Sequence, residues 1–453
     1  MNIFPLRGAS IKVKIPGFFR IGCLITPWLI ITALLIWALN LKDPHFLPLR
    51  PYETPILLSL SGLGIAWYFR RPGRRGKTLP ISALTVVMLL TLTGEGLFRY
   101  HRHAVLNGNN EGTRILGRHF VIGYVDPATV KPLIANGLIG GVFVTRRNVR
   151  GKTLEQFRDE IRGLQTIRKA AGLPPLIVAT DQEGGMVSRL SPPLVSRPGL
   201  ATLVAQEIPE GILVTRARAY GREQGRELAG VGVNVNFSPV VDLKSNRPPD
   251  PLDFHSHIDS RAISTDPALT ARVAQAYVRG LEEEGVLATL KHFPGLGRVT
   301  GDTHHFSATL EASPEDLAAR DWVPFSSVAS GSPALIMLSH VILARVDELN
   351  PVSFSRNVVQ RIIRQGWGHD GPLITDDLTM GAAYNRGLCE ATAKSLNAGV
   401  DLLLISYDFE KYYEAMYCAA SAYKQGNLDK AMLNASWRRL DNMFLRNYRE
   451  QRR

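Results

Sequence analysis

The sequence predicts an α/β protein, a (β/α)8 barrel of the TIM type that follows an N-terminal helical membrane anchor. Two observations lead to this prediction. Long apolar runs without charged side chains are confined to the first 105 residues of the 453-residue chain. Beyond residue 118, eight short apolar runs alternate with helical stretches, which is typical of repeated βα units. We therefore expect a membrane segment over 1–105 and a barrel domain over 106–453.

Three apolar runs in the N-terminal segment predict transmembrane helices near 21–41, 54–69 and 79–98. The first run has 21 residues and no charge, which is enough for a helix to cross about 30 Å of hydrocarbon. The second is short for a span, and the third carries Glu95 near its end. A cleaved signal peptide explains the first run poorly, because two more apolar runs follow without a clear small-residue cleavage site.

The basic residues of this segment predict where the body of the protein lies. They cluster before the first apolar run (7–20) and between the second and third runs (70–77). The positive-inside rule places both clusters in the cytoplasm, which requires three spans of a bacterial inner membrane and a periplasmic body. If the second run does not cross, the body is cytoplasmic and the 70–77 cluster is exported against the rule.

The net charge of +13 does not indicate nucleic-acid binding. Residues 1–105 hold 13 Lys and Arg against 3 Asp and Glu, whereas the rest of the chain holds 40 against 37. The body is therefore close to neutral and lacks a basic footprint for nucleic acid. The three cysteines form no CxxC motif: Cys23 lies in an apolar run, and we expect Cys389 and Cys418 to be buried free thiols rather than a disulfide.

The apolar runs of the body predict strands that are buried on both faces, as in parallel sheets, because they are continuous rather than alternating. They cover 119–125, 140–145, 175–181, 233–240, 286–293, 334–340, 372–377 and 400–405. An open doubly wound sheet is the alternative to a barrel. No glycine-rich phosphate-binding motif opens a helix, so no nucleotide or other cofactor is predicted.

Polar side chains lie where several of these predicted strands end. They are Asp181, Lys291, His292, His340, Asp376 and Asp377. In a TIM barrel the carboxyl ends of the strands converge on one mouth, where active sites are built. A single polar residue at a strand end commonly just begins a loop, but titratable groups at several ends predict a catalytic site.

Four motifs of the body resemble one enzyme family. KHFPGLG at 291–297 is followed by DTH at 302–304, and the chain also contains DQEGGMVSRL, ITDDLTMGA and NAGVDLLLI in the same order as the family. They resemble glycoside hydrolase family 3, in particular its bacterial β-N-acetylglucosaminidase branch. The resemblance covers roughly 118–440 and implies a hydrolytic TIM barrel.

The resemblance implies a catalytic role for three residues. Asp376, the first aspartate of TDD, matches the nucleophile of a retaining mechanism, which requires a carboxylate below the anomeric carbon. Asp302 and His304 match a pair in which the aspartate orients a histidine that donates and recovers the proton. By chemistry alone His305 is an equal candidate for the donor. Asp377 is expected to cap the following helix or to hydrogen-bond the loop.

The resemblance also implies a substrate-binding set. Lys291 and His292 match residues that hydrogen-bond sugar hydroxyls, and Asp181 matches an acid that holds hydroxyls of the non-reducing sugar. Arg261 matches an arginine that contacts the same sugar, and Arg189 is a weaker match. No metal ligand set is part of the pattern.

Two positions depart from the family motifs. Leu296 replaces the second histidine of KHFPGHG, and Met186 replaces the arginine of DQEGGRV. Neither position belongs to the expected nucleophile or to the Asp–His pair. We therefore expect activity to persist, with a less certain substrate preference.

These inferences predict a membrane-anchored exo-acting β-N-acetylhexosaminidase that removes terminal GlcNAc from peptidoglycan fragments or related glycans. A glycosidase for another sugar, or a phosphorylase of the same fold, is one alternative. A metal-dependent hydrolase is another, since His255 and His257 form an HxH motif that Asp302, His304 and His292 can extend. A glycan-binding protein without activity is the third. The sequence does not indicate an oligomeric state.

Overall fold

The computed structural model describes residues 17–73, 76–108, 111–206, 208–245, 256–299 and 307–450. The expected Asp302, His304 and His305 therefore lie outside the described residues, as does His255. The chain divides into two compact units, Met1–Tyr100 and His101–Arg453.

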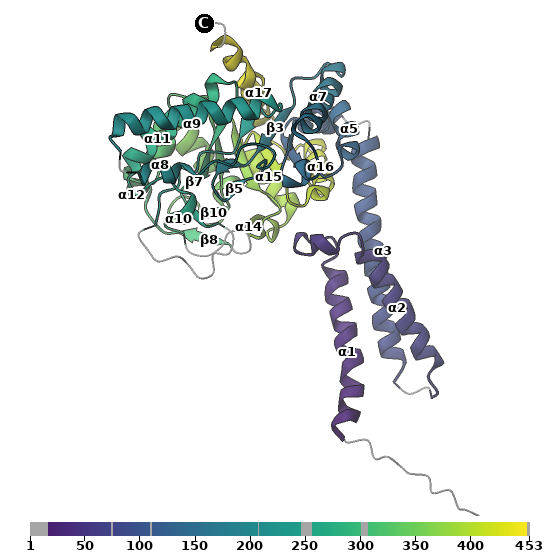
Figure 1. The fold of residues 1–453 in the computed structure, drawn as a ribbon. Coiled ribbons are helices and arrows are strands. Elements are labelled where there is room, and N and C mark those ends of the chain that lie inside the picture. The colour runs from purple at the N-terminus through teal and green to yellow at the C-terminus, as the bar shows by residue number, and fades with distance from the viewer. Residues whose placement is uncertain are drawn as a thin grey trace, which may run out of the picture. The chain divides into compact units, whose positions relative to one another are not determined.

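The first unit is helical. It contains α1 (Gly17–Leu39), the short 3-10 helix η1 (Pro44–Leu49), α2 (Glu53–Arg70) and the first part of α3 (Thr78–Asn107), which continues into the second unit (Figure 1). Each apolar run predicted as a helix forms one. Among the described residues, α3 is the one helix long and apolar enough to cross a membrane, and Ile25–Leu39 forms a shorter apolar helix.

The helices of the first unit pack through a narrow apolar interior. Leu57 and Val87 are fully buried there, whereas Trp28, Leu63 and Leu89 point outward and are largely exposed. Apolar side chains on the outside of a helical hairpin are stable in hydrocarbon and costly in water. The exterior of this helical unit is therefore rich in exposed apolar side chains.

The second unit is built around a closed parallel barrel. Its strand order is β1-β12-β11-β9-β7-β6-β3-β2. The barrel strands are β1 (Phe120–Gly123), β2 (Gly141–Phe143), β3 (Ile177–Thr180), β6 (Val235–Asn236), β7 (Leu287–Phe293), β9 (Leu335–Leu338), β11 (Leu373–Asp377) and β12 (Leu402–Ile405). Each lies inside one of the eight predicted runs, so the predicted TIM-like barrel is confirmed and the open sheet is excluded.

Helices surround this barrel, and α9 packs alongside α11 on its outside (Figure 1). The helices of the unit are α4 (Glu111–Gly117), α5 (Pro127–Ala135), α6 (Arg146–Val149), α7 (Leu154–Ala170), α8 (Leu200–Val204), α9 (Glu210–Gly230), α10 (Ile258–Arg261), α11 (Pro267–Glu283), α12 (Pro314–Ala319), α13 (Val323–Ala329), η2 (Val352–Phe354), η3 (Asn357–Gly366), α14 (Gly381–Tyr384), α15 (Leu388–Ala398), η4 (Phe409–Lys411), α16 (Tyr412–Lys424) and α17 (Lys430–Glu450). In the described part of the unit, four short strands lie outside the barrel: β4 (Gln182–Gly184) pairs with β5 (Val187–Ser188), and β8 (Ala308–Leu310) pairs with β10 (Val341–Leu343).

Local sequence explains where the long helices begin. Asp266 accepts hydrogen bonds from the first free amides of α11, and Pro267 occupies its first turn. Thr153 and Gln156 form a capping box at the start of α7. These caps start the helices that cover the barrel strands.

The inside of the barrel is filled by side chains from the strands. The rings of Phe143 and Phe237 stack with centroids 5.4 Å apart, and Met337 and Leu404 belong to the same buried cluster. Burying one such side chain stabilises the fold by about 1.5–3 kcal/mol. The barrel is therefore a packed core, and ligands have access only at its ends.

The expectation of two free thiols is wrong. Cys389 in α15 and Cys418 in α16 form a disulfide, with Cα atoms 5.2 Å apart. The residues are 29 positions apart, and they become neighbours only because α15 and α16 pack against each other. No local pattern around either cysteine reports this tertiary contact.

Candidate active site

A buried lysine connects the ends of two barrel strands. Lys291 lies in β7, and its ammonium is 2.6 Å from Oδ1 of Asp181, which directly follows β3. The same nitrogen is 2.7 Å from Oε1 of Glu183 in β4. The Lys291 side chain is only 3% exposed, so two carboxylates compensate a cation that has lost its water.

Arg261 approaches the same carboxylate from the end of α10. Its Nε and Nη2 donate to Oε2 and Oε1 of Glu183 at 2.9 and 2.7 Å, a two-point contact that fixes the plane of the guanidinium. Burial opposes ionisation of Glu183, but Arg261 and Lys291 together lower the pKa of Glu183 to about 2. The carboxylate is therefore ionised at neutral pH, and both cations are held by it.

His292 completes this polar cluster. Its Nδ1 lies 2.7 Å from Oδ2 of Asp242, and its Nε2 lies 3.4 Å from Nη2 of Arg261. Asp242 is fully buried and also accepts the backbone amides of His292 and Leu296, at 2.9 and 2.8 Å. Asp242 thus fixes both the imidazole and the backbone of the KHFPGLG loop.

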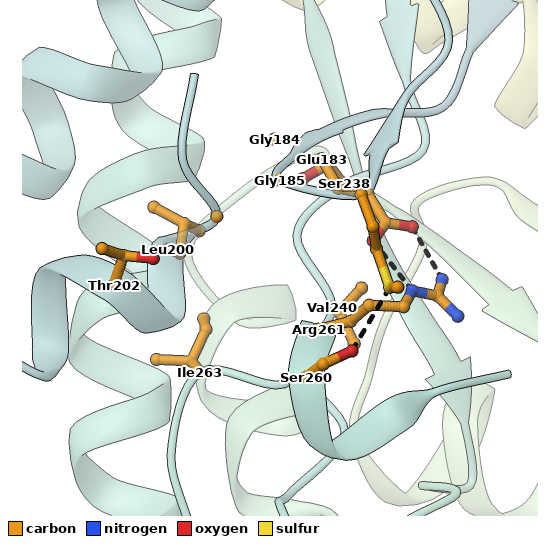
Figure 2. A pocket seen from close by; sticks show the side chains of 12 residues that line it. Glu183, Gly184, Gly185, Leu200, Thr202, Ser238, Val240, Ser260, Arg261 and Ile263 are labelled. Atoms are coloured by element: carbon orange, nitrogen blue, oxygen red, sulfur yellow. Dashed lines mark hydrogen bonds and ion pairs between the residues drawn. The ribbon is translucent and has the colours of Figure 1, made fainter. Parts of the chain in front are cut away.

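A pocket opens beside the cluster. Figure 2 shows Glu183 and Arg261 on one side of it, with Leu200, Thr202 and Ile263 across from them. Its other lining residues include Met186 and Ser260, whose hydroxyl lies 3.3 Å from the Met186 sulfur. The pocket is therefore charged on one wall and apolar on the other.

Asp376 lies near the end of β11 and is partly buried. Its Oδ1 accepts the backbone amide of Asp377 at 2.8 Å. The Asp377 carboxylate accepts hydrogen bonds from Thr379, Ser406 and Tyr407, which ties the end of β11 to the loop after β12. Asp377 therefore hydrogen-bonds the loops, as expected, and restrains the backbone that carries Asp376.

His340 reinforces the same strand end. It is buried after β9, with Nδ1 2.8 Å from the Ser353 hydroxyl and Nε2 3.0 Å from the carbonyl oxygen of Asp377. Its contacts are to the protein framework. His340 therefore links β9 to β11 beneath the mouth of the barrel.

The structure brings together four of the residues predicted to bind sugar: Asp181, Arg261, Lys291 and His292. Arg189 has an exposed side chain, and its backbone amide donates to the carbonyl of Asp181. Leu296 is buried, so its side chain packs in the loop where the family motif has a polar one.

The sequence interpretation missed two carboxylates of the cluster, Glu183 and Asp242. Glu183 stands two positions after Asp181, and alternate residues of an extended segment lie on one side, so the DQE pattern contained a usable signal. Asp242 lies two residues beyond the run 233–240, so it also follows a strand, but the sequence interpretation assigned no polar residue to that strand end.

The HxH alternative finds no support among the described residues. His257 has a left-handed backbone conformation, with φ of 43°, at the start of α10. Within the described ranges, no three His, Cys, Asp or Glu side chains are grouped as ligands for a metal ion. The described polar cluster instead pairs carboxylates with cations.

Comparisons with known proteins identify the family of the chain. The family profile described as "Glycosyl hydrolase family 3 N terminal domain" matches residues 120–443. The chain is similar to the beta-hexosaminidase LpqI of Mycobacterium tuberculosis, with 33% identity over 64% of this chain and 71% of that protein. It is 36% identical to a beta-hexosaminidase of Thiobacillus denitrificans, over 60% of this chain and 72% of the relative.

A solved structure shares the fold. The family 3 β-N-acetylglucosaminidase of Paenibacillus sp. str. FPU-7 superposes with a TM-score of 0.68 and 30% identity, over 74% of this chain. The chain spans 62% of the length of that structure. The matched region contains the whole barrel and its mouth, and by this match the chain belongs to glycosyl hydrolase family 3 and is a glycoside hydrolase.

Proposed function

We propose that the protein is a retaining, exo-acting β-N-acetylglucosaminidase. The observation that carries the proposal is the cluster of Asp181, Lys291, Arg261 and His292 at strand ends of the barrel that also holds Asp376. A sugar hydroxyl both donates and accepts hydrogen bonds, and the cluster offers an anionic acceptor next to cationic donors. The relatives are named beta-hexosaminidases, and the similar solved structure is named a β-N-acetylglucosaminidase, which supports the choice of GlcNAc.

In the proposed reaction, the Asp376 carboxylate attacks the anomeric carbon while the bond to the leaving oxygen breaks. His304 protonates that oxygen, and a glycosyl ester of Asp376 forms. His304 then takes a proton from water, which attacks the anomeric carbon and releases the sugar with the carboxylate regenerated. Asp302 orients His304 and stabilises its cation. The clamp of Asp377 on the loops supports the position of the nucleophile.

Asp181, Lys291, His292 and Arg261 bind the hydroxyls of the terminal sugar in this proposal. The side chain of Asp181 is 21% exposed, which makes it more accessible than the neighbouring carboxylates of Glu183 and Asp242. Arg189 is exposed on the adjoining loop and provides a further contact at the edge of the site. Terminal GlcNAc of peptidoglycan fragments or related glycans is the proposed substrate.

We further propose that residues 1–105 anchor the enzyme in a bacterial inner membrane through three helices, and that 106–453 form the periplasmic catalytic domain. The long apolar helix α3, the shorter apolar helix Ile25–Leu39 and the basic residues before α1 and after α2 support this topology. The Cys389–Cys418 disulfide supports it independently, because disulfides persist in oxidising compartments such as the periplasm.

The proposal is tested with the full chain in non-ionic detergent, on aryl β-GlcNAc and aryl β-glucoside. We expect turnover of the first and much slower turnover of the second, and loss of activity in Asp376→Ala. Free GlcNAc should form at the same rate with and without inorganic phosphate. Full activity of Asp376→Ala would refute the mechanism, and GlcNAc 1-phosphate as product would replace hydrolysis with phosphorolysis.

A reporter fused after Arg453 tests the topology. Alkaline phosphatase, which is active only outside the cytoplasm, should be active in this fusion, and a cytoplasmic reporter should be silent. The reverse pattern would show that the second apolar run does not cross.

A further inference from the structure

The carboxylate of Glu183 is held by two of the proposed sugar-binding side chains, and it is less exposed than the carboxylate of Asp181. Its side chain is 6% exposed, compared with 21% for Asp181. Both of its oxygens are occupied: Oε1 by Lys291 and Arg261, and Oε2 by Nε of Arg261. Figure 2 shows the Glu183 carboxylate directed at the Arg261 guanidinium.

From this arrangement we infer that Glu183 is a positioning residue, which sets the directions of Lys291 and Arg261 toward the sugar. The inference rests on the proposed function, because it assigns a role within that sugar site. The resemblance to the family assigns no role to Glu183.

Glu183 is mounted on a rigid support. Glu183 lies in the β4–β5 hairpin. The side chain of the neighbouring Gln182 accepts a hydrogen bond from the backbone amide of Leu190 and donates one to the Ser191 hydroxyl. Gly184, at φ of +91°, presses against Tyr220: a Cβ there would lie 2.3 Å from the Tyr220 hydroxyl oxygen. The hairpin cannot shift without breaking these contacts, so the carboxylate has a fixed position.

Charge balance explains why the position of this carboxylate matters. Lys291 is a buried cation, and the side chain of Arg261 is only 11% exposed. Without Glu183, Asp181 is the one carboxylate within the described residues that pairs with Lys291. Lys291 then pairs fully with Asp181 and occupies the carboxylate that is proposed to accept sugar hydroxyls. Arg261 loses its two-point contact and its fixed plane. Removing the Glu183 charge thus disturbs three binding side chains at once.

The test compares Glu183→Gln with the wild type in the full chain, on aryl β-GlcNAc. We expect KM to rise at least about 30-fold, and kcat/KM to fall about 100-fold, which is the loss that a misplacement of about 1 Å produces. Glu160→Gln is the matched control, because the Glu160 carboxylate also pairs with a lysine and a hydroxyl, Lys152 and Tyr124, outside the cluster. Its KM should stay within about twofold of the wild type.

A merely structural role for Glu183 predicts a different result. Both variants would then lower the melting temperature and the amount of active enzyme, with KM unchanged. Glu183→Gln with the wild-type KM would overturn the inference. If Glu183→Gln does not fold, Glu183→Asp is the second variant, because the shorter side chain keeps the charge but moves it away from both cations. The KM of Glu183→Asp should rise several-fold. A wild-type KM in Glu183→Asp would also overturn the inference. An inactive wild type refutes the proposed function itself.

Discussion

His119 makes the barrel sensitive to acid. It is completely buried just before β1, with Nδ1 2.8 Å from the carbonyl oxygen of Asp401 and Nε2 accepting a hydrogen bond from Trp437 at 3.1 Å. A neutral ring with its proton on Nδ1 satisfies both partners. Burial lowers the pKa of His119 from 6.5 to about 4, because the charged ring loses its hydration.

The protein therefore loses stability as the pH falls from 6.5 to about 4, the pKa values of His119 in the unfolded and folded chain. In this window the unfolded chain binds a proton on His119 and the folded barrel does not, so the free energy of unfolding decreases as the pH falls. The difference between 6.5 and about 4 corresponds to about 3 kcal/mol, and most of it is lost by about pH 4.5. Above pH 6.5 the ring is neutral in both states and contributes no pH dependence.

Replacement of His119 by glutamine removes the titratable ring but keeps one hydrogen-bond donor and one acceptor. The free energy of unfolding is measured by urea titration of the full chain in detergent, followed by circular dichroism. Between about pH 7 and pH 4.5, we expect this free energy to decrease by about 2–3 kcal/mol less in His119→Gln than in the wild type. His369, whose pKa burial also lowers to about 4, is unchanged in both proteins and cancels. His103→Gln, at an exposed position, should retain the wild-type dependence. Equal pH dependence in wild type and His119→Gln would refute the reasoning.

Three further predictions test other parts of the molecule. Asp377→Ala should lower kcat about 100-fold in steady-state assays, because the loops that support Asp376 lose their common acceptor; an unchanged kcat would contradict this. Asp401→Asn should lower the free energy of unfolding by about 3–5 kcal/mol in urea titrations, since buried Arg364 and Arg439 lose their counter-ion, and KM should remain unchanged. Met186→Arg adds a charged donor to the pocket wall and should lower KM for aryl β-GlcNAc up to about tenfold; an unchanged KM would place the sugar away from this wall.

The barrel could be predicted because each of its strands carries a local signal. A strand buried on both faces is a continuous apolar run, such as 400–405, and a helix interrupts each pair of runs. The repeat of these two patterns determines the fold without knowledge of any long-range contact. The disulfide had no such signal, since nothing in the sequence near Cys389 or Cys418 reports that α15 and α16 pack together.

The site could be predicted in part for the same reason. Residues at strand ends, such as Asp181 and Lys291, meet because the barrel is closed, so the fold prediction placed them together. The partners that come from loops were not predictable in this way. Arg261 reaches Glu183 across 78 positions of sequence, and only the folded paths of the β4–β5 hairpin and α10 bring the two together.

The charges of the cluster also explain what kind of ligand it suits. Lys291 and Arg261 are balanced by Asp181 and Glu183, and Asp242 adds a further negative charge beside His292. Two cations and three carboxylates leave the group without a net positive charge, so an anionic ligand gains little from entering it. A neutral hydroxyl gains from both signs, because its oxygen accepts from Lys291 while its proton is donated to Asp181. The same pairing that stabilises the buried charges thus favours a neutral sugar over a phosphorylated one.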